Sequence, residues 1–269
     1  MNWENIQKNF EFLVHKYEYL IKGEKNITED CPIWVMWYQG IKFAPPIVQA
    51  CISSIIKNKA KHKIIIVDKY NINKYIKFPS FIIEKFNNRT FSITHFSDIV
   101  RMALLFKYGG YWIDSTYFIS SPITKVNTTF YSLKLSYNYK HRNPLFICKC
   151  SGNFLAVPKN SFFATYGYFS FLYYWKKYNS LIDYFLLDYI IHIAYNYSID
   201  FQNIVNKLPY ICNIHSLVKV LNSEYNQSDF NCHINKLRRK NRYTLIKNKK
   251  QTNYGYIIEK NKLNFSSTV

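Results

Sequence analysis

The sequence lacks the long apolar segments that place a chain across a membrane. Among its 269 residues there is no run of about 18 apolar residues, the usual minimum for a membrane-spanning helix. The most apolar candidate, residues 181–197, is interrupted by Asp183, Asp188 and His192. The amino terminus, MNWENIQKNFEF, also lacks the apolar core of a secretory signal. From these absences we expect a cytoplasmic protein without a transmembrane helix.

Acidic residues are scarce relative to basic ones. The 16 Asp and Glu residues stand against 36 Lys and Arg residues, which gives a formal net charge of +20. An excess of this size predicts attraction to anionic partners such as nucleotides, phospholipid head groups or nucleic acid. The alternative is compositional, because abundant Lys, Asn, Ile and Tyr are typical of an AT-rich coding sequence.

One basic stretch, residues 234–250, contains no acidic residue. Lys and Arg side chains near an anionic lipid surface gain roughly 1 kcal/mol each. The stretch therefore predicts a possible contact with an anionic membrane surface, with the compositional explanation still open. Its basic residues are Lys236, Arg238, Arg239, Lys240, Arg242, Lys247, Lys249 and Lys250.

Cysteine is sparse and shows no metal-binding pattern. The C-x-C of Cys148 and Cys150 is too short for the usual zinc spacing, and no second pair answers it. The histidines show no metal-binding spacing either. In a chain without an export signal we therefore expect free thiols. The six cysteines are Cys31, Cys51, Cys148, Cys150, Cys212 and Cys232.

No internal repeat or Gly/Ser linker divides the chain, and we expect one compact domain with three parts. Residues 1–30 form a helical lead-in, because apolar side chains recur there at helical spacing up to Gly23. Residues 31–160 form the core. Residues 161–269 form a mainly helical region with a basic, weakly patterned tail.

Strands and helices alternate between residues 31 and 114. This alternation indicates an α/β fold with a parallel sheet of Rossmann type. The predicted strands cover residues 33–37, 63–67 and 111–113, and the predicted helices cover residues 45–57, 81–86 and 96–108. Trp37, Asp68 and Asp114 come at the carboxyl ends of the strands, where such sheets bind their ligands. The pattern therefore predicts a nucleotide crevice at these ends.

The strongest indication of a binding site comes from charged residues on either side of the third predicted strand. Asp98 and Arg101 are three residues apart, so they share one face of a helix that is otherwise apolar. A charged pair on such a helix indicates a crevice or a buried network, with a surface salt bridge as the alternative. Gly109 and Gly110 permit a tight reversal into the strand. Asp114 follows that strand, and a turn or helix cap is its alternative role.

These motifs resemble a known family. The segment HFSDIVRMALLFKYGGYWIDST is similar to the sugar-binding region, containing the DXD motif, of glycosyltransferase family 32, and more closely to its capsular polysaccharide synthesis subgroup. IWVMWYQG with APPIVQACISSI, and YYWKKYNSLIDYFLLDYIIHIAY with its D-Y-F element, resemble further segments of that subgroup. The resemblance covers most of residues 31–197. It implies a GT-A fold, in which a Rossmann-like domain holds a nucleotide-sugar donor at the strand ends.

The resemblance assigns roles to individual residues. It implies that Trp37 stacks on the nucleotide base. Asp98 and Arg101 would hold the donor sugar and the neighbouring phosphate, and Asp114 would touch ribose, sugar or metal. Asp98, Arg101 and Asp114 are therefore the expected catalytic residues, and Thr116 completes the expected donor site.

The resemblance also implies a divalent cation, Mn²⁺ or Mg²⁺, on the donor diphosphate. The family's second acidic position is Thr116 here, so the expected ligands are Asp114 and Thr116. A neutral hydroxyl is a weaker ligand for a hard cation than a carboxylate. With a weakly held metal, Arg101 and basic residues of the carboxyl-terminal third would neutralise more of the diphosphate charge.

Further candidates flank the signature. Asp183 and Asp188 lie on one predicted helix, about 140° apart around its axis, so one can face a cleft while the other faces water. Asp183, in the D-Y-F element, is the expected acceptor-binding residue, with a helix-surface or tyrosine-bonded carboxylate as the alternative. His95 directly precedes the signature and is a candidate for lining the site.

The expected function is transfer of a hexose from a nucleoside-diphosphate sugar, with UDP favoured, to a capsular polysaccharide or another cell-surface saccharide or lipid-linked acceptor. The resemblance implies retention of the anomeric configuration. We expect a cytoplasmic enzyme that associates with the inner face of the plasma membrane. One alternative is a basic nucleic-acid-binding protein, although no recognised nucleic-acid module is present and we expect no nucleic-acid partner. The other is a transferase-like scaffold made silent by Thr116.

Overall fold

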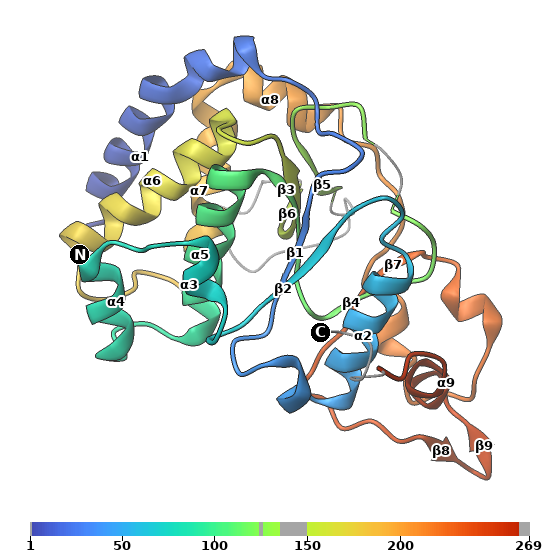
Figure 1. Ribbon diagram of the computed structural model, residues 1–269. Helices are drawn as coiled ribbons and strands as arrows, with labels where there is room; N and C mark the ends of the chain where they lie inside the picture. The colour runs from blue at the N-terminus through green and yellow to red at the C-terminus, as the bar shows by residue number, and fades with distance from the viewer. Residues whose placement is uncertain (1, 124–125, 135–149, 264–269) are drawn as a thin grey trace.

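The computed structural model of the protein describes residues 2–123, 126–134 and 150–263. A five-stranded sheet of order β2-β1-β3-β6-β5 lies at its centre (Figure 1). Its strands are β1 (Ile33–Met36), β2 (Ile64–Val67), β3 (Gly110–Ile113), β5 (Tyr131–Lys134) and β6 (Cys150–Val157). Strands β2, β1 and β3 are parallel, whereas β6 runs antiparallel to both β3 and β5. The fold is therefore mixed α/β.

The parallel half of the sheet confirms the alternation predicted for residues 31–114. Strand β1 lies between β2 and β3, with Ile33 opposite both Ile64 and Tyr111. Every residue of β1 and β3 is buried, as expected for strands that are covered on both faces. The carboxyl ends of β1 and β3 therefore meet at one edge, and the residues that follow them lie close together.

Helices cover the sheet on both sides (Figure 1). Helices α1, α5, α6 and α7 pack together on one side, and α2 and α9 pack against each other on the other side. The helices are α1 (Trp3–Tyr17), α2 (Pro46–Lys57), α3 (Ile72–Tyr75), α4 (Ser80–Asn87), α5 (Ile93–Tyr108), α6 (Phe162–Lys177), α7 (Leu186–Tyr197), α8 (Ile199–Asn206) and α9 (Asn253–Lys260). None of those in the described ranges has the length and apolarity to cross a membrane.

Two glycines fix the connection from α5 to β3. Gly109 and Gly110 have φ angles of 67° and 95°, in the region that disfavours other residues. A Cβ atom on Gly110 would lie 2.2 Å from the carbonyl oxygen of Pro32, and one on Gly109 would lie 2.4 Å from the amide nitrogen of Lys159. The close backbone approach sets β3 beside β1, and it thereby directs Asp114 to the edge where β1 also ends.

The carboxyl-terminal part returns to this edge through a small second sheet. Strand β4 (Tyr117–Ile119) pairs antiparallel with β7 (Ile234–Lys236), with Tyr117 opposite Lys236. The tail, whose sequence is weakly patterned, nevertheless forms regular elements. The segment contains β7, a hairpin of β8 (Ile246–Lys247) and β9 (Lys250–Gln251), and α9. These strands are short, and their pairing depends on distant residues, so local periodicity does not reveal them.

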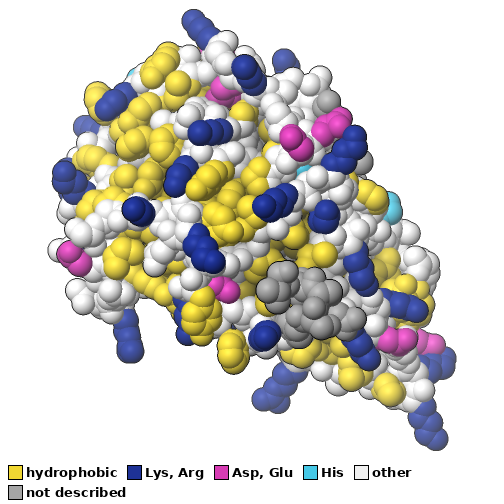
Figure 2. All heavy atoms as spheres, in the orientation of Figure 1, with side chains coloured by type: hydrophobic (Ala, Val, Ile, Leu, Met, Phe, Trp, Pro, Cys, Tyr) yellow, Lys and Arg dark blue, Asp and Glu magenta, His cyan; other side chains and the backbone are white. Residues whose placement is uncertain are grey.

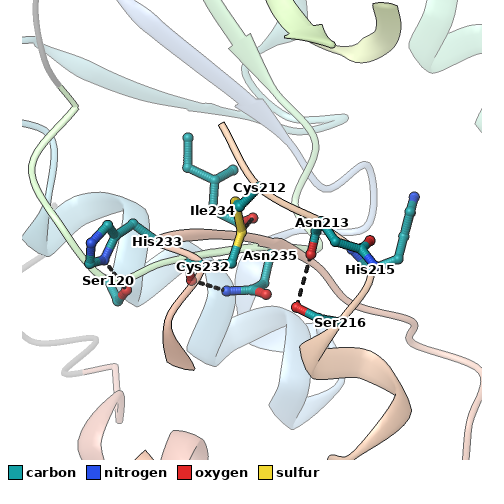
Figure 3. Close-up of a disulfide and its surroundings, with 9 residues drawn as sticks. All are labelled: Ser120, Cys212, Asn213, His215, Ser216, Cys232, His233, Ile234 and Asn235. Atoms are coloured by element: carbon teal, nitrogen blue, oxygen red, sulfur yellow. Dashed lines mark hydrogen bonds between the residues drawn. A yellow bond between two sulfur atoms is a disulfide. The ribbon is translucent and has the colours of Figure 1, made fainter. Parts of the chain in front are cut away.

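A disulfide joins Cys212 to Cys232 just before β7 (Figure 3). The expectation of free thiols was therefore wrong for this pair. The two cysteines are 20 residues apart, and their Cα atoms lie 5.7 Å from each other once the segment has folded. Spacing alone does not indicate this proximity, because it depends on the docking of β7. Cys31 and Cys51 remain thiols as expected, and Cys148 lies outside the described residues.

Candidate active site

A cavity of about 740 Å³ lies at the carboxyl ends of β1 and β3. Trp37 lines it from the end of β1, and Asp98 and Arg101 line it from α5. Asp114 and Thr116 line it from the loop after β3. The structure therefore brings together the five residues that the sequence assigned to the donor site.

A second cavity of about 580 Å³ lies at the opposite ends of the strands. Cys31, Gly110 and Val157 line it, together with Glu24, whose carboxylate accepts a hydrogen bond from the backbone of Phe162 at the start of α6. Glu24 thus caps a helix. Ligands of α/β sheets bind outside the carboxyl ends of the strands, so we assign the site to the larger cavity.

Asp98, Arg101 and Asp114 form what we call the floor of the larger cavity. Arg101 holds these three side chains together. Its side chain is 5% exposed, and its Nη2 atom lies 3.1 Å from Asp98 Oδ1 and 2.9 Å from Asp114 Oδ1. Its Nη1 atom donates to the carbonyl of Gly152 at 2.6 Å. The guanidinium also stacks on the Trp112 ring, 5.0 Å from its centroid. The charged pair on α5 therefore belongs to a buried network and not to a surface salt bridge.

Both carboxylate oxygens of Asp114 are occupied by donors. Oδ1 accepts from Arg101 Nη2 at 2.9 Å and from Trp112 Nε1 at 2.8 Å. Oδ2 lies 2.7 Å from the ammonium of Lys236. Burial favours the protonated form, but Lys236 and Arg101 hold the pKa of Asp114 below its usual value. The side chain of Asp114 is thus an ionised member of a charge network, while its backbone carbonyl accepts from the Tyr117 N–H at 3.0 Å and opens the turn to β4.

Sequence reasoning missed Lys236 as the partner of Asp114. Lys236 ends β7, and its ammonium lies 4.8 Å from the centroid of the Tyr117 ring on β4. Two signals were available, the basic stretch and the expectation that basic residues of the carboxyl-terminal third neutralise charge at the site. Neither indicated which lysine, because the β4–β7 register that aligns Lys236 with Asp114 is a long-range feature.

Three consecutive cations, Arg238, Arg239 and Lys240, line the mouth of the cavity, and we call them the basic rim. They follow β7 and are exposed. Arg239 stacks on the Trp37 ring, with its Cζ atom 5.7 Å from the ring centroid. The Nε1 atom of Trp37 is buried and has no hydrogen-bond partner among the described residues. Its stacking on a nucleotide base stays a prediction.

Two aspartates in the cavity titrate near neutral pH. Burial raises the pKa of Asp98 to about 7, more than the charge of Arg101 lowers it. Asp188, in the first turn of α7, also lines the cavity, and burial raises its pKa to about 6. Arg101 therefore lies between an ionised Asp114, which Lys236 supports, and an Asp98 that readily takes up a proton.

The helix expected to carry Asp183 and Asp188 begins only at Leu186, so the prediction that both aspartates share it was wrong. The carboxylate of Asp183 accepts a hydrogen bond from the backbone N–H of Phe185 at 2.9 Å. Such a local bond offers the backbone an alternative to the helix. Asp188 and Tyr184 line the cavity, whereas Asp183 does not. Acceptor binding by Asp183 stays a prediction.

His95 lies beneath the floor and is not one of the residues that line the cavity. It is 3% exposed, and its Nε2 atom accepts a hydrogen bond from Trp175 Nε1 at 2.9 Å. Its Nδ1 atom lies 3.9 Å from Asp98 Oδ2. Burial lowers the pKa of His95 to about 4, so the ring is neutral at physiological pH. Its role is to pack under Asp98.

A match to a known family shows which family the chain belongs to. The model of the capsular polysaccharide synthesis protein family matches residues 2–258. The chain belongs to this family. The subgroup to which the sequence motifs pointed is thereby confirmed, while the wider assignment to glycosyltransferase family 32 stays a prediction.

Individual relatives are more distant. The O-glycosyltransferase braB of Annulohypoxylon truncatum is 34% identical over an alignment of 103 residues, and the match covers 35% of this chain and 24% of that protein. The match therefore spans only about a quarter of this relative's length. Among solved structures, the PaToxG glycosyltransferase overlaps 76% of this chain and 82% of its own, with 12% sequence identity and a TM-score of 0.42.

The residues of the site do not fit the Mn²⁺ or Mg²⁺ ion that the resemblance to glycosyltransferase family 32 implies. A hard divalent cation needs oxygen ligands with available lone pairs. Both oxygens of Asp114 already accept from protein donors, and Thr116 is neutral. Within the described ranges, no group of three or more His, Cys, Asp or Glu side chains is placed to hold a metal.

Proposed function

We propose that this member of the capsular polysaccharide synthesis protein family is a glycosyltransferase, specifically a hexosyltransferase, with a GT-A type nucleotide-binding fold. It moves a sugar from a nucleoside-diphosphate donor, with UDP favoured, to a capsular or other cell-surface saccharide, free or lipid-linked. The observation that carries the proposal is the cavity floor, where one buried guanidinium is fixed between Asp98 and Asp114. Carboxylates suit sugar hydroxyls, and a guanidinium suits phosphate oxygens.

The charges of the cavity suit the bond changes of sugar transfer. The bond from the anomeric carbon to the phosphate oxygen breaks, and its electron pair leaves with the nucleoside diphosphate. The acceptor hydroxyl oxygen bonds to the anomeric carbon, and its proton passes to the leaving phosphate. Arg101 and the basic rim lie in one cavity, where fixed cations stabilise the negative charge that develops on the leaving group. Attack from the leaving-group side, with retention of configuration, is the course that the resemblance to glycosyltransferase family 32 implies, and we include it in the proposal.

The remaining cavity residues have roles that follow from their positions. Trp37, at the end of β1, offers a ring for the nucleotide base and an unpartnered indole N–H for a polar group of the donor. Asp98 and Asp188 are the acidic groups best placed to hold sugar hydroxyls, because both line the cavity and neither forms a salt bridge with a lysine within the described part of the chain. Tyr184, which is 63% exposed, lies at the edge where an acceptor would enter.

Thermal unfolding with candidate donors tests the proposal. A donor present at 100 times its Kd stabilises the folded protein by about 2.7 kcal/mol. We expect such a shift with one UDP-sugar, and smaller or no shifts with GDP-sugars, CMP-sugars and duplex DNA. Asp114→Asn should abolish both the shift and release of sugar from the donor. Asp200→Asn, at an exposed position of α8, is the matched control and should change neither.

The opposite result would reject the enzyme class. If no nucleotide sugar shifts the unfolding temperature while DNA does, the protein is a nucleic-acid binder. If a nucleotide sugar binds but is neither hydrolysed nor transferred in the presence of any saccharide acceptor, the protein is a silent scaffold.

The β8–β9 hairpin supports the predicted contact with an anionic membrane surface. Leu245 and Ile246 are 53% and 65% exposed, and Lys247, Lys249 and Lys250 follow them directly. Figure 2 shows Lys and Arg side chains around this projecting end of the molecule, at the lower right. Exposed apolar side chains can enter the boundary between head groups and acyl chains, and lysines beside them can bind anionic lipid head groups. We expect co-sedimentation with vesicles containing phosphatidylserine, none with phosphatidylcholine alone, and a clear loss in Leu245→Ser/Ile246→Ser.

A further inference from the structure

The second oxygen of Asp114 is covered by a lysine. The ammonium of Lys236 lies 2.7 Å from Asp114 Oδ2, and its side chain is only 17% exposed. The first oxygen accepts from Arg101 and Trp112. An incoming metal ion would therefore have to displace a partly buried lysine before it could bind this carboxylate.

Backbone structure holds Lys236 in this position. The N–H of Lys236 donates to the carbonyl of Ile214 at 2.8 Å, and the next N–H, of Leu237, donates to the carbonyl of Thr116 at 2.9 Å. The Tyr117 ring lies beside the ammonium, 4.8 Å away. A lysine that is fixed by its backbone, by a carboxylate and by an aromatic ring is a preorganised charge, unlike a mobile surface lysine.

The balance of charge around Asp114 disfavours a metal. One carboxylate faces two cations, Arg101 and Lys236, at hydrogen-bond distance, so no net negative charge remains there for a divalent ion. The basic rim adds three further cations to the same cavity. The cavity thus already holds the positive charge that a diphosphate requires.

Resting on the proposed transferase function, we propose that Lys236 is a positioning residue that stands in for a divalent cation at Asp114, so that Arg101 and the basic rim bind the donor diphosphate and sugar transfer needs no metal. Lys236 acts through Asp114: it neutralises the carboxylate and keeps it fixed against Arg101. The neutral Thr116, in place of a second acidic residue, is consistent with this arrangement.

Titration with Mn²⁺ alone tests the inference without a donor. Electron paramagnetic resonance of free Mn²⁺ should show no specific binding to the wild-type protein. Lys236→Met uncovers a carboxylate oxygen and should bind Mn²⁺ specifically, at least about tenfold more tightly than the weakest binding that the wild-type titration could detect. The reason is that hard cations need ionised oxygen ligands. Lys236→Arg keeps the cation and should behave as wild type. Lys247→Met removes an exposed lysine of β8 and is the matched control.

Two results of this titration would overturn the inference. One is tight Mn²⁺ binding by wild-type protein that Asp114→Asn abolishes. The other is a Lys236→Met protein that is folded, as shown by its cooperative thermal unfolding, but gains no Mn²⁺ binding. Lys236→Gln provides a second uncharged variant if Lys236→Met does not fold.

Turnover with and without metal separates this inference from the proposed function. Wild-type protein should release or transfer the sugar equally well in EDTA and in Mn²⁺, whereas Lys236→Met should lose activity in EDTA and regain part of it with Mn²⁺. Wild-type activity that appears only with Mn²⁺ would overturn the role of Lys236 and leave the transferase function intact. Absence of donor binding in either condition would reject the transferase function, and the Mn²⁺ titration would still decide the role of Lys236.

Discussion

The floor and the basic rim of the cavity are both charged, but they are built differently. The floor charges are paired within the protein, with a buried Arg101 fixed on the half-buried Asp98 and Asp114. The rim charges are exposed, and Arg239 stacks on a tryptophan instead of a carboxylate. Floor charges are therefore part of the folded structure before any ligand binds. Rim charges contribute little to folding and are available to an anionic ligand.

Removal of Arg101 should have the largest effect. Arg101→Ala leaves the half-buried Asp98 and Asp114 without their shared, buried cation, and breaking a buried pair in this way costs about 3–5 kcal/mol. We expect a loss of this size in the free energy of unfolding, measured by urea denaturation. Arg239→Ala, on the rim, should change it by less than about 0.5 kcal/mol. Equal effects of the two variants would abolish the distinction between floor and rim.

Removal of the whole rim should affect binding and leave folding intact. In Arg238→Ala/Arg239→Ala/Lys240→Ala, donor affinity should fall about 10- to 100-fold, because hydrogen bonds to charged groups contribute roughly 1.5–3 kcal/mol. Isothermal titration at two salt concentrations measures it, and the wild type should show the steeper salt dependence. Arg242→Ala/Lys247→Ala/Lys249→Ala removes as many exposed cations that do not line the cavity. A similar loss in this control would mean that net charge alone attracts the donor.

Donor binding should strengthen as the pH falls from 8 to 6. Asp98, with a pKa of about 7, and Asp188, with a pKa of about 6, take up protons over this range, so the cavity becomes more positive while the diphosphate diester of the donor stays ionised. We expect about a fivefold to tenfold gain, because one charge beside Arg101 is removed. Asp98→Asn should flatten most of this dependence, and Asp200→Asn should leave it unchanged. An unchanged slope in Asp98→Asn would show that Asp98 is not the titrating group.

The same titration affects stability with a defined sign. The pKa of Asp98 is about 7 in the folded protein, and its usual value is 3.8. At a pH between these two values, the folded protein keeps a proton on Asp98 that the unfolded chain releases. The contribution of Asp98 to stability is therefore present at low pH and is lost as the pH rises through about 7. Comparison of urea unfolding at pH 5 and pH 8 should show a larger loss in the wild type than in Asp98→Asn, where only Asp188, with a pKa of about 6, still titrates in this way.

The half of the site that precedes residue 117 could be predicted from the sequence, because its signals are local. Asp98 and Arg101 share a helix face, Gly110 marks the turn, and Asp114 ends a strand, and all of these are readable within one stretch of chain. Trp37 followed from the parallel order of the strands. The four side chains, Trp37, Asp98, Arg101 and Asp114, line the cavity because helix and strand periodicity determine their positions.

The other half could not be predicted, because it depends on tertiary contacts. Lys236 reaches Asp114 through the β4–β7 pairing, and Cys232 reaches Cys212 through the same docking. The start of α7 could not be predicted either, because the Asp183 carboxylate accepts a hydrogen bond from the Phe185 N–H and Asp183 lies outside the helix. Short strands and local side-chain caps leave no periodic signal in the sequence.

Trp37 lies where the floor and the rim meet, and its substitution should have the smallest effect. Trp37→Phe keeps an aromatic ring for Arg239 and for a base but removes the unpartnered Nε1 atom. If the ring supplies the binding energy, the donor Kd should rise less than about threefold, because stacking on an aromatic ring tolerates a change of ring. Isothermal titration with the donor measures this change. A loss of tenfold or more would instead assign the contribution to a hydrogen bond from the indole, and Trp37 would then belong with the fixed, directional groups of the floor.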